Sequence, residues 1–289
     1  MELLAAAEWH DLASAHYLAV DPWIQPRLYR RAEQEKHPVD DFLFEYYPIS
    51  PAKLRAWHPG FGFELQATEE DYELFNPRHY SFADGHVTLR GEWLDESHEK
   101  FLNIRNFLAA TAARPARTGC FGLHEWAMVL GQNNVRHDAW PLRLNQDDIR
   151  RTIDEQGLRC THFDAFRFFT DEARPLNPIQ LTRDDQFGIE QPGCLHANMD
   201  LYKHAFTLAP VIGSNLVRDA FALAKDIREV DMQVAPYDLS PLGVTPIAVE
   251  TEAGRAEFAH KQNEFSVRAT AIREALISRI DSTIGVSLD

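Results

Sequence analysis

The sequence predicts a mainly helical, α-rich α+β protein with one small β-hairpin element. Apolar residues recur at helical spacing through most of the chain, which is the pattern of amphipathic helices. Alternation of apolar and polar residues is clearest over residues 80–89, around an Asp84-Gly85 turn, which indicates a hairpin. No repeat, low-complexity tract or Gly/Ser-rich linker interrupts the chain, so we expect a single globular domain over residues 1–289.

The elements before the hairpin are predicted to be helices. Residues 1–20 and 22–36 have helical spacing and are expected to form two of them. A short helix follows, with Ser50 as its capping residue, Pro51 in its first turn and His58-Pro59-Gly60 as its stop.

Helical spacing returns after the hairpin, with one long interruption. Residues 174–192 hold three prolines and no clean period, which predicts a long ordered loop that could act as a lid. Ser214 is expected to cap the second of the last three helices, and Thr251 or Glu252 to begin the third. The helices predicted in this part cover residues 97–113, 123–131, 146–156, 195–208, 214–233 and 252–283.

The charge balance is acidic and disfavours DNA as a partner. The chain has 44 acidic against 29 basic residues and a formal net charge of −15. Proteins gain much of their affinity for nucleic acids from cations that neutralise phosphates. No Lys/Arg run is longer than the doublets at Arg30-Arg31 and Arg150-Arg151, so nonspecific DNA binding is not expected.

The N-terminal residues and the cysteines predict a cytoplasmic protein without a membrane anchor. The chain begins with acidic residues where a signal peptide has basic ones, and no apolar run approaches the length needed to cross a bilayer. Three cysteines, an odd number, argue against a disulfide framework and leave packing, metal or redox roles.

The first candidate constellation is the segment from Cys120 to Trp126. A turn containing Gly122 leads into a predicted helix that presents His124 and Glu125 in its first turn. Helix N-termini favour anions and lower the pKa of a nearby imidazole. Adjacent residues do not share a helix face, so His124 and Glu125 would serve different partners. The alternative is that Glu125 caps the helix and His124 packs in the core.

The second candidate constellation is the segment 159–169. If it is extended, a period of two places Cys160, His162, Asp164 and Phe166 on one face. Such a mixture of polar and aromatic side chains is typical of a pocket wall. The alternative is a buried His162–Asp164 network that only supports the fold.

The third candidate constellation lies on the predicted helix 195–208. His196, Asp200, Lys203 and His204 fall within one narrow arc of this helix. Most of its proton-active groups are thus predicted to share one face, although a solvated outer face would look the same.

Histidines near cysteines and carboxylates raise the question of a metal site for iron or zinc. All three cysteines lie within four residues of a histidine, but their spacing matches no zinc-finger or zinc-ribbon pattern. A histidine and carboxylate site is therefore favoured over a thiolate site. Its candidate histidine ligands are His124, His162 and His196, with Glu125, Asp164 and Asp200 as candidate carboxylates.

A further carboxylate, Asp231, falls inside the apolar face of the predicted helix 214–233. A carboxylate that points at a core needs a partner or a shifted pKa. An ion pair with Arg228 or with an arginine elsewhere is the simplest explanation.

Four stretches resemble actinobacterial proteins commonly labelled 3-methyladenine DNA glycosylases. The likeness covers nearly the whole chain and implies excision of alkylated purines by hydrolysis of the N-glycosidic bond, with no residue-level assignment to transfer. The stretches are HPVDDFLFEYYP (37–48), GCFGLHEWAM (119–128), CTHFDAFRFF (160–169) and QPGCLHANMDLYK (191–203).

Three hypotheses for function follow. The first is a glycosylase-like hydrolase that stacks an alkylated purine in an aromatic pocket and activates water with a carboxylate. Its candidate catalytic residues are His124, Glu125, Asp164 and Asp200, and its candidate substrate-binding residues are Trp126, Phe166, Arg167, Tyr202 and Lys203. The second is a metal-dependent enzyme, with non-haem iron or zinc, that acts on a small molecule. The third is a noncatalytic binding or scaffold protein, in which the polar clusters are fully paired structural networks.

Overall fold

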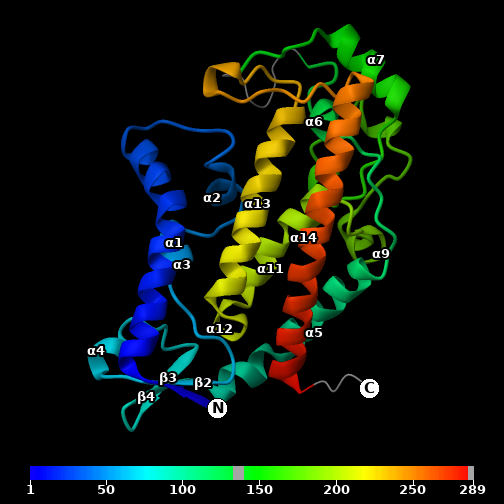
Figure 1. Cartoon of the computed structure of the whole chain (residues 1–289). Helices are drawn as coiled ribbons and strands as arrows, with labels where there is room; N and C mark the ends of the chain where they lie inside the picture. Colours follow the sequence, from blue (N-terminus) through cyan, green and yellow to red (C-terminus); the bar gives the residue numbers. More distant parts are fainter. Residues whose placement is uncertain (133–139, 286–289) are drawn as a thin grey trace. The chain divides into compact units, whose positions relative to one another are not determined.

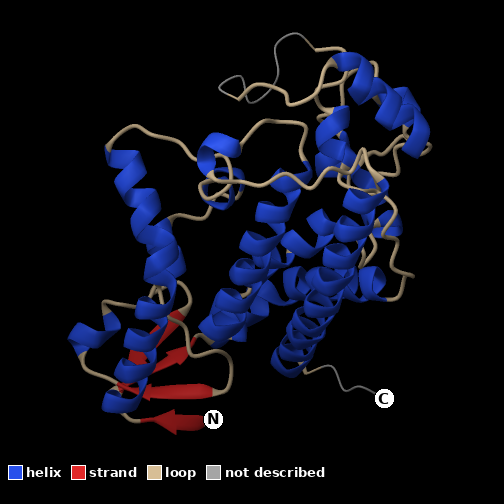
Figure 2. Cartoon of the chain, turned by 45° about the horizontal axis from the view of Figure 1, so that its top comes forward, coloured by secondary structure: helices blue, strands red, loops and turns tan. Residues whose placement is uncertain are grey.

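The computed structural model describes residues 1–132 and 140–285, and helices make up most of it (Figure 2). The strands in the described residues form one small four-stranded sheet, which confirms the mainly helical, α-rich α+β class. The chain divides into two compact units. The first unit comprises residues 1–109, 201–222 and 272–289, and the second comprises residues 110–200 and 223–271. A single globular domain stays a prediction.

The sheet belongs to the first unit and contains the predicted hairpin. Strands β3 (Tyr80–Ala83) and β4 (His86–Leu89) pair antiparallel, and Asp84 and Gly85 between them have φ angles of 51° and 79°. A two-residue hairpin turn requires positive φ at both positions, and Asp-Gly supplies it. Strand β4 also pairs with β2 (Phe63–Gln66), which runs parallel to β1 (Glu2–Leu4). These two strands are too short to show alternation, so they were not predicted.

The N-terminal helix is longer than predicted. Helix α1 (Ala6–Ala32) is continuous, so the predicted break after residue 20 is wrong. The prediction of a helix at residues 2–4 is also wrong, because these residues form β1. Pro22 and Pro26 lie inside α1 and are exposed. Their four-residue spacing places both on one outer face, where water can bond the carbonyl groups that lose their helical partners.

Two predicted caps had different outcomes. The Ser50 hydroxyl accepts a hydrogen bond from the Lys53 N–H and caps α3 (Pro51–Arg55), as expected. The Ser214 hydroxyl instead accepts from the His58 N–H and donates to the Ala56 carbonyl, so its expected capping role is wrong. The other helices that lie wholly or largely in this unit are α2 (Phe42–Tyr46), α4 (Glu69–Tyr72), α5 (Gly91–Ala112), α11 (Leu201–Thr207) and α12 (Ala209–Ile212).

The second unit consists of short helices and parts of two long ones. Residues 223–234 of α13 (Ser214–Val234) and the first part of α14 (Glu252–Ile284) lie side by side within it (Figure 1). The Thr251 hydroxyl accepts a hydrogen bond from the Gly254 N–H, which confirms the predicted start of α14. The short helices are α6 (Leu123–Ala127), α7 (Gln146–Gln156), α8 (Phe163–Phe166), α9 (Gln186–Ile189) and α10 (Leu195–Met199), with 3₁₀ turns η1 (Arg174–Leu176), η2 (Arg183–Asp185) and η3 (Ser240–Leu242).

Two predictions for the second unit are corrected. The segment 159–169 is not extended throughout, because α8 begins after His162 and the N–H of Phe166 bonds the His162 carbonyl. A period of two therefore does not place these side chains. The predicted helix 195–208 is two helices, α10 and α11, which meet at Asp200. Residues 174–192 contain η1, η2 and α9 between irregular stretches, and their role as a lid stays a prediction.

No helix in the described part of the chain combines the length and the apolar character needed to span a bilayer.

Candidate metal centre

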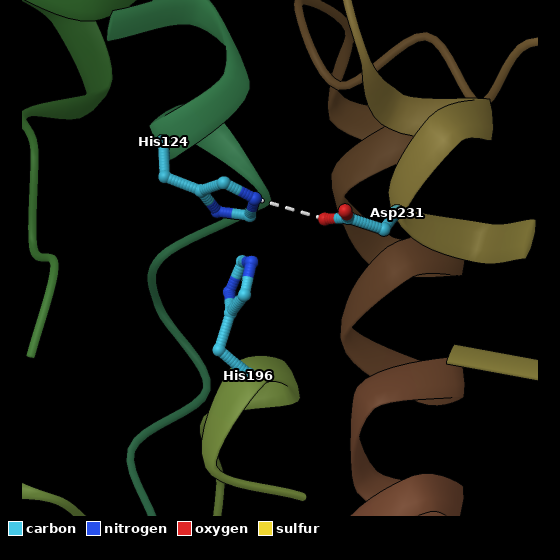
Figure 3. Close-up of side chains that lie close together, drawn as sticks. All are labelled: His124, His196 and Asp231. Carbon is cyan, nitrogen blue, oxygen red and sulfur yellow. Dashed lines mark ion pairs between the residues drawn. The ribbon is translucent and has the colours of Figure 1, made fainter. Parts of the chain in front are cut away.

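Two histidines and an aspartate converge in the second unit from three separate elements. His124 comes from α6, His196 from α10 and Asp231 from α13 (Figure 3). One potential ligand atom of each lies within 4.8 Å of the other two. His124 Nε2 is 2.8 Å from Asp231 Oδ1, and the His124 and His196 rings meet edge to face with centroids 4.4 Å apart. Side chains 107 positions apart thus form one polar cluster.

A glycine allows α6 to approach α13 closely enough for this contact. Gly122, which precedes α6, has a left-handed conformation with φ 68°. A Cβ atom at this position would lie 2.3 Å from Val234 Cγ2. The Trp126 indole also donates a hydrogen bond of 2.8 Å to the Val234 carbonyl. These contacts join α6 to the end of α13 and place His124 opposite Asp231.

Arg228 holds the far side of the Asp231 carboxylate. Its Nη1 donates to Asp231 Oδ2 at 2.8 Å and to Glu125 Oε1 at 3.4 Å. The expected Arg228–Asp231 ion pair is therefore present, and the second carboxylate oxygen faces His124. Such outer partners orient a metal ligand.

The contact between His124 and Asp231 is close but is not a hydrogen bond. Neither His124 Nε2 nor Asp231 Oδ1 has a hydrogen-bond partner, although both are buried and only 2.8 Å apart. The ring N–H direction therefore does not point at the oxygen. Buried polar atoms are normally hydrogen-bonded. Two ligands that are each about 2.0 Å from one ion are about 2.8 Å apart when they lie at a right angle, so this spacing is compatible with a shared ion.

Charge and burial act in opposite directions on the pKa values of the cluster. Burial alone would raise the pKa of Asp231, but His124, His196 and Arg228 hold it below its usual value. Burial would lower the pKa of His124, but Asp231 and Glu125 raise it. Burial and repulsion by His124 lower the pKa of His196 to about 3, so His196 is neutral at pH 7 and can bind a cation.

A second group of polar residues lies beside the first. His162 Nε2 is 3.5 Å from Glu190 Oε1 and 3.4 Å from Asp200 Oδ2. All three side chains are buried, and the His162 and His196 rings are stacked with centroids 5.3 Å apart. Burial would lower the pKa of His162, but the nearby Asp200 and Glu190 carboxylates raise it.

A narrow cavity reaches the histidines, and a larger one adjoins it. The inner cavity, about 20 Å³, is lined by His124, His162, His196 and all three cysteines. That is the volume of roughly one water-sized sphere. The outer cavity, about 410 Å³, shares four lining residues with the inner one: Cys120, Arg159, Cys160 and Thr161. A small molecule in the outer cavity would therefore lie next to the histidine cluster.

The cysteines are free thiols and contribute no ligand atom to the cluster. Gln262 Nε2 donates to Cys120 Sγ at 3.3 Å, and Cys160 Sγ donates to the His162 carbonyl at 3.4 Å. Burial raises the pKa of all three thiols, that of Cys160 to about 12. Protonated thiols are poor metal ligands.

The predicted carboxylates Glu125, Asp164 and Asp200 do not line the inner cavity. Glu125 is buried and pairs with Arg228. Asp164 pairs with Arg167 at 3.1 Å and with Arg183 at 3.3 Å, whereas the partners of His162 are Glu190 and Asp200.

The predicted substrate-binding residues do not line the inner or outer cavity. Trp126 and Phe166 are buried within the second unit, and Arg167 is exposed beside Asp164. Tyr202 and Lys203 belong to the first unit, where Tyr202 is buried and Lys203 is exposed. Their roles stay predictions.

No family model, curated protein or solved structure matches the chain. The resemblance to the 3-methyladenine DNA glycosylases therefore stays a prediction from the sequence.

Two residues of the site were not among the predicted ligands. Asp231 carried a signal, because it is a carboxylate on the apolar face of its helix. Glu190 carried none, because it lies in the aperiodic stretch 174–192 and only folding brings it to His162.

Proposed function

We propose that this protein is a metal-dependent enzyme that acts on a small molecule, with iron or zinc bound by His124, His196 and Asp231. The observation that supports it is the convergence of two imidazoles and a buried carboxylate on one point. Two histidines and one carboxylate are the ligand set of non-haem iron oxygenases and of several catalytic zinc sites. Both leave coordination positions open for water or substrate.

The surroundings suit catalysis at such an ion. A bound metal would polarise a substrate oxygen or lower the pKa of a bound water. Arg228 would keep the Asp231 carboxylate oriented, and the outer cavity of about 410 Å³ offers room for a small substrate. The net charge of −15 disfavours DNA as that substrate. A cytoplasmic location remains part of the proposal.

Elemental analysis of protein purified without chelator tests the proposal. The wild-type chain should carry at least one equivalent of iron or zinc. The variants Asp231→Asn and His196→Ala should lose that metal, whereas the matched variants Asp226→Asn and His260→Ala should retain it. Asp226 lies on the same helix but pairs with Arg268, and His260 is exposed. A metal-free wild type that stays metal-free after reconstitution with Fe²⁺ or Zn²⁺ would overturn the proposal.

Excision of alkylated purines rests on the sequence resemblance alone. It predicts release of 3-methyladenine from methylated DNA without added metal, and a local basic patch for the DNA backbone. The same purified protein tests it in a base-release assay with and without chelator. The residues expected to form that patch are Arg150, Arg151, Arg159, Arg167 and Arg183.

A further inference from the structure

We propose that a second metal ion binds beside the first, between His162, Glu190 and Asp200, so that the centre is dinuclear. This inference rests on the proposed function, because the first ion would occupy the adjacent His124, His196 and Asp231 group.

The spacing of the second group fits metal ligands better than hydrogen-bond partners. His162 Nε2 lies 3.5 Å from Glu190 Oε1 and 3.4 Å from Asp200 Oδ2. These distances are too long for strong charge-assisted hydrogen bonds, which are about 2.7–2.9 Å. Two ligands that are each about 2.1 Å from one tetrahedral ion are about 3.4 Å apart. An ion between the imidazole and a carboxylate would need little rearrangement.

The ring nitrogens of His162 also lack hydrogen bonds, although the side chain is deeply buried. Its side chain is 1% exposed, and neither Nδ1 nor Nε2 makes a hydrogen bond. A buried polar group without a hydrogen-bond partner is destabilising. An ion at Nε2 would satisfy one of the two nitrogens.

The buried charges also call for more than one cation. Five carboxylates are buried in the described part of the second unit, and one of them, Asp164, pairs with Arg167 and Arg183. For the other four, Glu125, Glu190, Asp200 and Asp231, Arg228 is the only buried arginine or lysine among the described residues of that unit. Uncompensated buried charge is strongly unfavourable. With Arg228, one divalent ion would leave these four carboxylates with one excess negative charge, whereas two divalent ions and a bound hydroxide would balance the charge. Protons on the histidines are the alternative compensation, and metal content distinguishes the two.

The two groups are adjacent but not equivalent. The stacked rings of His162 and His196 place the two groups side by side, and both rings line the inner cavity. In the described part of the chain, only the first group brings three ligand atoms within 4.8 Å of one another. The second ion should therefore bind more weakly and be lost first on dialysis. A pair of ions would clamp an oxygen-rich substrate and favour hydrolysis.

Native mass spectrometry and elemental analysis of the zinc-loaded full chain test this inference. We expect two ions in the wild type and one in His162→Ala and Glu190→Gln. Asp164→Asn is the matched control, because Asp164 is buried nearby but pairs with arginines, and it should retain two ions.

The outcomes separate the two proposals. One ion in the wild type, with no loss in His162→Ala, would overturn the second site and leave the first. No ion in any protein, whether it is loaded with Zn²⁺ or with Fe²⁺, would overturn both. Because a variant can fail to fold, crystals of the wild type soaked in Zn²⁺ provide a check that needs no substitution. Anomalous density at one position would refute the inference, and density at two positions on either side of His196 would support it.

Discussion

Replacement of Gly122 by alanine should destabilise the second unit and displace His124. The residue has φ 68° and ψ 11°, and an added Cβ would lie 2.3 Å from Val234 Cγ2. A left-handed conformation is unfavourable for alanine by about 1–2 kcal/mol. Overpacking of a core is destabilising by about 1–3 kcal/mol more. The free energy of unfolding should therefore fall by about 2–5 kcal/mol.

Gly243 offers a matched control within the same unit. It has φ 75° and ψ 12°, but an added Cβ would meet no atom within 4 Å. Gly243→Ala should therefore lower the unfolding free energy only by the backbone contribution, about 1–2 kcal/mol. Urea denaturation of the two variants measures the difference, and zinc content reports whether His124 has moved. In a Val234→Ala background, which removes the clashing methyl group, Gly122→Ala should lose most of its excess effect.

Equal effects of Gly122→Ala and Gly243→Ala would refute this reasoning. So would full metal binding by a Gly122→Ala protein that has lost several kcal/mol of stability, because the glycine would then not position His124.

Three other predictions follow from the structure. Burial, with the charges of His79 and His16, lowers the pKa of His58 to about 3, and its Nδ1 lies 2.8 Å from the Tyr80 hydroxyl. As the pH falls, His58 is therefore protonated in the unfolded state before it is protonated in the folded state. The unfolding free energy should fall between about pH 6.5 and pH 3, by up to about 1.4 kcal/mol per pH unit. Urea titrations at pH 7 and pH 5 should show a smaller fall for His58→Gln than for the wild type. Burial raises the pKa of the Cys160 thiol to about 12, so iodoacetamide at pH 8 should modify Cys160 at least about 100-fold more slowly in native than in urea-unfolded protein. Peptide mass spectrometry measures the two rates, and comparable rates would contradict this prediction. Chelator should lower the Tm of the wild type, because a metal that binds only the folded state stabilises that state. It should leave the Tm of metal-free Asp231→Asn unchanged. An equal drop in both proteins would mean that the chelator acts elsewhere.

Local signals in the sequence were sufficient for much of the secondary structure. The Asp84-Gly85 hairpin and the Ser50 cap depend on a few neighbouring residues, so their sequence patterns predict them directly. The continuous α1 was not predictable in this way, because the tolerance of Pro22 and Pro26 depends on which face of the helix meets water. The extended reading of residues 159–169 failed for a similar reason, since periodicity in a short polar segment does not exclude a helical turn.

The sequence by itself determined the mainly helical class, the hairpin and the three histidine-bearing segments, because these depend on residue type and on contacts close along the chain. Only the tertiary structure decided that β1 pairs with β2 and that His124, His196 and Asp231 converge. It also decided that the partners of His162 are Glu190 and Asp200 and not Asp164. Such pairings join residues far apart in the chain, and they depend on how helices pack and on close approaches such as that of Gly122 to Val234. No local pattern records them.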